Sequence, residues 1–302
     1  MVGGERKMSS SKKIKRSAGD RAFDWINYLF LALFSLTILF PFWNLFVQSV
    51  SSPDSGVVDA LQMWPKKFSA FNYKYVLANK YIWTGYRETL IRTIAGTALS
   101  VTLTAMGAYV LSKKKLPNRN FWTTVVLIPM FFSGGMIPSY LWMVNLHLID
   151  NRLVLILPGL ISSYNLIIMR NFFMSVPEGL EESAMIDGAG SIRIFFSIVL
   201  PISKAVLATV ALWVMVGHWN AWFDATIYIR DANKLPLQVV LRRILMEGTQ
   251  QMMDMNSTDT NHVTPDTLKA ATTFVCMLPI MCVYPFVQKY FVKGVIIGSL
   301  KG

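Results

Sequence analysis

The chain has 302 residues, of which 53% are hydrophobic and only 15% are charged, and its mean hydropathy is +0.42. A soluble domain carries about 25% charged residues, so this composition argues against a soluble protein and predicts an integral membrane protein. The two cysteines, Cys276 and Cys282, lie in one apolar run, which argues against a disulfide framework. The net charge of +12 is densest beside apolar segments, which indicates membrane topology and argues against nucleic-acid binding.

Six apolar stretches contain no Asp, Glu, Lys or Arg, and a bilayer-spanning helix needs roughly 20 such residues. They are residues 25–53, 93–112, 120–149, 153–169, 205–223 and 270–288. The fourth is short, and we expect Arg152 and Arg170 at its ends to snorkel to the two interfaces. The second is rich in Gly, Ala, Ser and Thr, which favours close helix packing. The sequence therefore predicts an all-α integral membrane protein with six transmembrane helices, in which internal prolines mark kinks or breaks.

Basic residues set the orientation, because Lys and Arg close to span ends stay on the cytoplasmic side. The tail SKKIKR and the run KKK thus place both termini in the cytoplasm, with KKIKR as a topology determinant or, alternatively, a site for anionic membrane lipid. The predicted parts are a basic tail at 1–24, a membrane domain at 25–292, a tail at 293–302, and long extracytoplasmic loops at 54–92 and 224–269.

Residues 173–203 then form a cytoplasmic loop between the fourth and fifth spans. Acidic residues follow Pro177, as is favourable at a helix start, and Gly188 and Gly190 allow the chain to turn. The segment 191–200 is amphipathic, and we expect one apolar face made of Ile192, Phe195, Phe196 and Val199. On the residues alone, this loop is either a docking site for a cytosolic partner or a simple change of chain direction.

The loop resembles the EAA loop of permease subunits of bacterial ABC importers. The match is carried by Glu182-Ser183-Ala184, by Gly188, and by the Ile-Val-Leu-Pro run at 198–201, with Ser183 standing where the family usually has Ala. The resemblance continues through FFSGGMIPSYLWMVNLHLIDN, LVLILPGLISSYNLIIMRNFF, GHWNAWFD and QKYFVKGVIIGSLKG. These segments are similar to the maltose-type carbohydrate importers, and most of all to the so-called lipoprotein permease branch linked to complex oligosaccharides.

The resemblance implies a type I ABC importer permease in the bacterial cytoplasmic membrane. It implies a second homologous permease, two ATPase subunits that hold ATP and Mg²⁺, and an extracytoplasmic sugar-binding lipoprotein or periplasmic protein that delivers an oligosaccharide. The chain itself has no phosphate-binding loop, so it is expected to be a transport subunit without a bound cofactor and not an enzyme. The residues expected to couple to the ATPase are Glu182, Ser183, Ala184, Asp187, Gly188 and Arg193.

Two further sets of residues are assigned on the same basis. In the family, the loop between the last two spans approaches the binding protein, and here it carries Arg242, Arg243 and Glu247, with a solvated loop as the alternative. Candidates for the substrate path combine aromatic faces with amide groups. They are Tyr140, Asn165, Trp219, Asn220 and Trp222. The alternative for the tryptophans is an aromatic belt at the interface.

The residues also suggest two other functions. A self-contained secondary transporter is suggested by the prolines that break the spans, but six spans without an evident inverted repeat disfavour it. An intramembrane enzyme would rest on His218 and Asp224, whose spacing of six does not place them on one helix face. No metal-ligand spacing is present, because His147, His218 and His262 are scattered.

Overall fold

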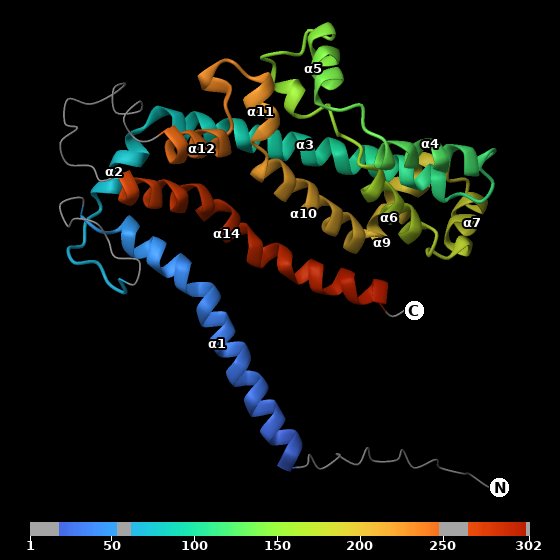
Figure 1. Ribbon diagram of the computed structural model, residues 1–302. Helices are drawn as coiled ribbons and strands as arrows, with labels where there is room; N and C mark the ends of the chain where they lie inside the picture. The colour runs from blue at the N-terminus through green and yellow to red at the C-terminus, as the bar shows by residue number, and fades with distance from the viewer. Residues whose placement is uncertain (1–17, 53–61, 248–264, 300–302) are drawn as a thin grey trace.

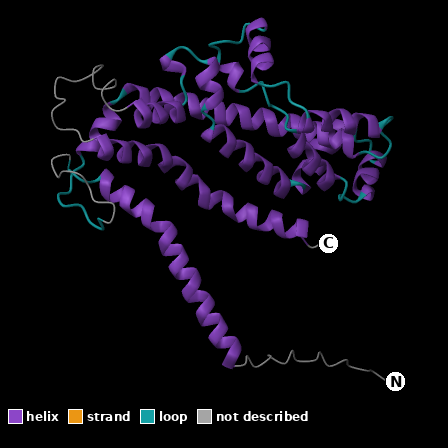
Figure 2. Cartoon of the chain, viewed as in Figure 1, coloured by secondary structure: helices purple, strands orange, loops and turns teal. Residues whose placement is uncertain are grey.

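The computed structural model describes residues 18–52, 62–247 and 265–299, which are helical apart from loops and one isolated β-bridge between Ser51 and Phe68 (Figure 2). The helices are α1 (Ala18–Ser49), α2 (Phe71–Ala78), α3 (Lys80–Ser112), α4 (Arg119–Phe131), α5 (Met136–Asn145), α6 (Ser163–Phe173), α7 (Glu178–Ile186), α8 (Ser191–Ile194), α9 (Leu200–Ile202), α10 (Lys204–Asn220), α11 (Phe223–Tyr228), α12 (Leu237–Glu247) and α14 (Pro265–Ser299). Short 3₁₀ helices are η2 (Arg152–Leu155) and η4 (Ala232–Lys234), and a π-helical turn is η3 (Phe195–Val199).

Within the described residues, three helices are long and apolar enough to cross a membrane: Gly19–Ser49, Lys80–Ser112 and Asp266–Val283. Two more candidates are bent pairs, α4 with α5 at 111° and the α8–α9 segment with α10 at 83°. The predicted all-helical membrane fold is thus confirmed, with three to five candidate spans where six were expected. The second span starts at Lys80, well before residue 93, and α14 continues to Ser299, past the expected end at 288.

The fourth predicted span, 153–169, is not a continuous helix. It consists of η2, a non-helical segment and the start of α6. Pro158 and Gly159, whose φ is +77°, lie in the interruption, and a proline followed by a left-handed residue ends a helix. The side chain of Ser162 then caps α6 by accepting a hydrogen bond from the backbone N–H of Asn165 at 3.4 Å.

Helix α3 is the central element, because it contributes to both hydrophobic cores. At its start, Ile82 packs in a cluster with residues of α2, α11, α12 and α14. At its end, Ala105, Ala108 and Tyr109 pack with residues of α6 to α10. In Figure 1, α3 runs the length of the bundle, with α10 alongside it and α6 and α7 near its end. A single helix therefore joins the two hydrophobic cores.

Helix α1 contacts α14 near one end and then diverges from the bundle (Figure 1). The residues near its end, such as Val47, are buried, whereas Phe23, Trp25, Phe30 and Leu36 are each more than half exposed. Pro41 does not end this helix. An apolar helix with this much exposed surface requires lipid or another membrane protein around it.

Candidate functional site

The EAA-like segment forms a short helix closed by a glycine cap. The backbone N–H of Gly188 donates to the carbonyl of Met185 at 3.0 Å, and that of Ala189 donates to the carbonyl of Ala184 at 2.9 Å. This pair of bonds is the Schellman motif, and it needs a left-handed residue after the helix end. Gly188 supplies it with φ +79°, and a Cβ there would meet nothing within 4 Å. The glycine at 188 is thus required by backbone conformation and not by crowding.

The chain turns between α7 and α8 as predicted, but the predicted face of the second segment is wrong. Gly190 has an ordinary φ of −71°, so only Gly188 needs a glycine's conformational freedom. The buried face of the second segment consists of Ile194, Phe195 and Val199, while Ile192 and Phe196 are exposed. The π-helical turn at Phe195–Val199 departs from α-helical spacing, and Ile194 and Val199, five residues apart, are both buried.

The start of α7 is attached to the end of α3. The Lys113 ammonium forms an ion pair with Glu181 and lies 3.9 Å above the centre of the Tyr109 ring. Tyr109 also packs on Phe195, with ring centres 5.0 Å apart. A second pair joins Lys114 to Glu178 at 2.8 Å, and the Lys114 side chain lowers the pKa of this exposed carboxyl. The loop is therefore fixed to α3 on one side.

The other side of the loop is exposed and mixed in character. Glu182, Asp187 and Arg193 are exposed there, beside the exposed apolar residues Met185, Ile186 and Ile192. Ser183 is exposed, but its hydroxyl donates to the Gly179 carbonyl at 2.8 Å. Ala184 is buried and packs α7 against the core. Of the predicted coupling residues, Glu182, Asp187 and Arg193 are thus at the surface, and Ala184 and Gly188 set the shape.

At the opposite end of α3, a buried arginine joins two helices. Arg92 is 5% exposed, and its guanidinium forms a bidentate ion pair with Asp224 of α11. Its Nε donates to Nδ1 of His218 at 3.3 Å, and Nη1 donates to the Ala221 carbonyl at 3.4 Å. His218 and Asp224 converge on Arg92 because the helix ends at Asn220, between them. Arg92 was missed in the sequence because it lies just outside the expected second span.

One turn earlier on α3, Glu88 is also buried, at 3% exposure. Arg152 donates to its two carboxylate oxygens at 2.6 and 3.0 Å, and Arg87 donates to Oε1 at 2.8 and 3.0 Å. Arg152, which is expected to snorkel to an interface, also ties η2 to α3. Its side chain remains about half exposed, so the pair sits at the edge of the bundle.

The comparisons with known proteins account for this architecture. The model of the family "Binding-protein-dependent transport system inner membrane component" matches residues 11–297. The chain belongs to this family. It is 39% identical over 300 residues to Protein LplC of Bacillus subtilis (strain 168), covering 98% of this chain and 100% of that protein. It is 38% identical over 284 residues to the polygalacturonan/rhamnogalacturonan transport system permease protein YtcP of the same organism, covering 94% and 99%.

A solved structure agrees with the relatives. The chain superposes with a TM-score of 0.83 and 32% identity on a chain of a bacterial ABC transporter involved in the import of the acidic polysaccharide alginate, covering 92% of this chain and 100% of that one. The protein is therefore a membrane-embedded permease subunit of a binding-protein-dependent importer, a transport component and not an enzyme. A self-contained secondary transporter is not favoured, because importer permeases match nearly the whole chain.

Three of the five predicted path residues, Tyr140, Trp219 and Trp222, pack in or against the first hydrophobic core, and Asn165 and Asn220 do not. Trp222 lies beneath Arg242, whose guanidinium is 3.8 Å from the ring centre, and Tyr140 stacks on Tyr228 with centres 6.0 Å apart. Trp219 is buried, and Asn220 is exposed at the end of α10. Asn165 is buried at the start of α6, beside Leu166 of the second core.

The predicted binding-protein contacts all lie on α12. Arg242 and Arg243 are exposed on this helix, and Glu247 is its last residue. The polar stretch that follows falls outside the described residues, as do the basic tail at 1–17 and the last residues, 300–302. Within the described residues, no group of three His, Cys, Asp or Glu side chains is placed to hold a metal ion.

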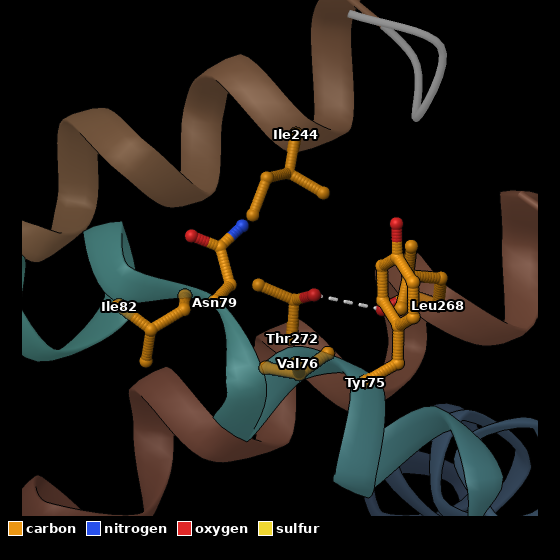
Figure 3. Close-up of a pocket in the computed structure, with 7 residues that line it drawn as sticks. All are labelled: Tyr75, Val76, Asn79, Ile82, Ile244, Leu268 and Thr272. Atoms are coloured by element: carbon orange, nitrogen blue, oxygen red, sulfur yellow. Dashed lines mark hydrogen bonds between the residues drawn. The ribbon is translucent and has the colours of Figure 1, made fainter. Parts of the chain in front are cut away.

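A small cavity lies where α2, α12 and α14 meet (Figure 3). It is lined by Tyr75, Val76, Asn79, Ile82, Ile244, Leu268 and Thr272. Its volume is about 10 Å³, which is about enough for one water molecule and far too small for a sugar. The Thr272 hydroxyl donates a hydrogen bond to the Leu268 carbonyl at 2.8 Å, so it is already satisfied within its own helix. Most of the other lining residues are apolar. This cavity is a packing gap and not a substrate site.

Proposed function

We propose that the permease pairs with a second, homologous permease and takes up oligosaccharides released by an extracytoplasmic sugar-binding protein. Two ATPase subunits, which bind ATP and Mg²⁺, drive the cycle from the cytoplasmic side, where both termini lie. The observation that carries the proposal is the glycine-capped α7, fixed to α3 by Lys113 and Glu181 and exposed on its other face. A short rigid helix with an exposed apolar and charged face is suited to docking a protein partner.

The exposed apolar surface of α1 supports the pairing with a second permease and with membrane lipid. The exposed arginines of α12, together with Glu247, are assigned to the contact with the binding protein. Tyr140, Asn165, Trp219, Asn220 and Trp222 remain candidates for the path of the sugar.

The substrate class that fits best is an oligosaccharide with carboxylate groups. YtcP is named for polygalacturonan and rhamnogalacturonan, and the solved structure belongs to an importer of an acidic polysaccharide. In this chain, the exposed Arg242 lies above Trp222, with its guanidinium 3.8 Å from the ring centre. A guanidinium that lies over an indole ring is held in place by the ring and can still pair with a carboxylate, so Arg242 suits the carboxylate of a uronic acid unit.

The test is uptake of labelled oligogalacturonate into vesicles that contain the permease with its co-purified partners. The Gly188→Val variant forces a β-branched residue to φ +79°, so it should keep its membrane insertion and lose ATP-driven uptake. The matched control is Gly179→Ala on the same helix, where a Cβ also meets nothing within 4 Å and φ is not positive. Full uptake by Gly188→Val, or uptake that needs an ion gradient and no ATP, would overturn the proposal.

A further inference from the structure

Helix α3 carries a row of hydroxyl side chains along one face, here called the hydroxyl row. It consists of Thr93, Thr97, Ser100 and Thr104, whose spacings of four, three and four place them on one side of a helix. Thr93, Ser100 and Thr104 are 5%, 3% and 1% exposed, and the Thr97 hydroxyl oxygen is buried as well. The hydroxyl row therefore faces the interior of the bundle and not lipid.

Three of these hydroxyls have no hydrogen-bond partner in the part of the chain that the structure describes. They belong to Thr93, Thr97 and Thr104. Elsewhere in the protein, helical threonines donate to the carbonyl four residues earlier, as Thr209 does to Ala205 at 2.9 Å and Thr272 does to Leu268 at 2.8 Å. That bond is the usual way in which a threonine satisfies its hydroxyl inside a helix. The three threonines of α3 do not form it, although they are buried.

Two more unpartnered polar atoms lie on the neighbouring helix or at its N-cap. They are the hydroxyl of Ser203, just before α10, and Nε1 of Trp219, near its end. Helix α10 packs along α3, so five of the six buried side-chain atoms without a partner among the described residues belong to this helix pair. A buried polar group without a partner costs free energy and calls for an explanation.

We propose that the hydroxyl row of α3, together with Trp219, forms part of the sugar path and is closed in this conformation. When α3 and α10 separate, these groups turn toward the path and exchange hydrogen bonds with water or with the hydroxyls of the passing oligosaccharide. Attachment of α3 to the coupling loop through Lys113 gives a route by which ATPase movement reaches this helix. This inference rests on the proposed function and adds residues that the sequence indicated only for helix packing.

The first test replaces three hydroxyls by methyl groups of similar size, in a Thr93→Val, Thr97→Val, Thr104→Val variant. Because these hydroxyls have no partner here, the variant should keep its melting temperature in detergent or raise it. Uptake of oligogalacturonate should nevertheless fall by about tenfold or more, since each hydroxyl binds in the open path. The matched control is Thr102→Val, an exposed threonine on the opposite face of α3, which should transport normally.

The second test measures access to the hydroxyl row directly. Thr104→Cys is made with Cys276 and Cys282 replaced by alanine, after uptake in that background is shown to be normal. A charged, water-soluble thiol reagent should label Cys introduced there only after the ATPase is trapped with ATP and vanadate. Labelling that stays absent in every trapped state, normal uptake by the triple valine variant, or a large loss of its thermal stability would overturn the inference. If the unmodified complex shows ATP-driven uptake in the same assay, these outcomes overturn only this inference. If it shows none, the proposed function fails.

Discussion

Arg92 and Asp224 are 132 residues apart in the sequence and form a bidentate ion pair at the point where α10 breaks before α11. The arginine side chain is 6% exposed and the aspartate side chain 31%, so the two partners do not depend on the pair equally. The pair fixes the broken helix against α3, close to Trp222 and to the end of the hydroxyl row. It also explains why His218 and Asp224 come together without forming a catalytic site.

The two single variants of this pair should differ in stability. Asp224→Ala leaves a buried guanidinium without its counter-ion and should cost about 3–5 kcal/mol. Arg92→Met should cost less, because the freed carboxylate is partly exposed and still accepts the backbone N–H of Ala225 at 2.8 Å. Melting temperatures in detergent, with the double variant completing a cycle, measure the coupling. Additive effects, or a larger loss in Arg92→Met, would contradict this account.

Gly96 should tolerate no larger residue while His218 is present. An added Cβ would lie 2.5 Å from Nε2 and 2.8 Å from Cε1 of the His218 ring, which is held by Arg92. Gly96→Ala should therefore destabilise the protein by about 1–3 kcal/mol. His218→Ala in the same chain should recover part of this loss. Gly217→Ala is the matched control, because nothing lies within 4 Å of its Cβ and alanine favours the helix.

The ion pair between Lys113 and Glu181 should affect transport more than folding. Lys113→Met and Glu181→Gln each release the start of α7 from α3 while the buried Ala184 and Phe195 still hold the loop. We expect each to lower uptake by about tenfold, which corresponds to about 1.4 kcal/mol of coupling, with little change in melting temperature. Exchange of the two residues, Lys113→Glu with Glu181→Lys, should restore part of the uptake. No recovery in the exchanged variant would argue against a role for the pair in coupling.

Asp150 should make stability depend on pH in the acidic range. It lies between α5 and η2 at φ +59°. The backbone N–H of Asp231, then the Lys234 side chain and the Arg230 N–H, lower its pKa below the ordinary value of 3.8. A lowered folded-state pKa contributes stability that is complete above the unfolded-state pKa and is lost as pH falls through the folded-state value.

The comparison variant for this effect is Asp150→Asn, since asparagine also tolerates a positive φ. At neutral pH the variant should be less stable by less than about 1 kcal/mol, because the site is partly exposed and screened. The difference from the unmodified protein should shrink as the solution becomes strongly acidic. A difference that stays constant over the whole range would show that the Asp150 charge does not contribute.

The sequence determined the class of protein and the position of its EAA-like loop. Membrane-spanning segments can be predicted from uncharged apolar stretches because the bilayer sets their length. The EAA-like loop can be predicted because its match, from Glu182 to Pro201, is contiguous in the sequence. Gly188 was placed correctly for the same reason, since a helix cap is a local structure.

Only the tertiary structure decided how distant residues combine. Arg92 meets Asp224, Glu88 meets Arg152, and α10 packs against α3, each through contacts between segments far apart in the chain. Hydrophobic periodicity also did not predict the π-helical turn at Phe195–Val199 or the break after Ile156. Both depart from the regular helical spacing on which such predictions rely. Local hydrogen bonds and hydropathy depend on residues that are neighbours in the sequence. Ion pairs and buried hydroxyls between distant segments depend on which helix faces meet.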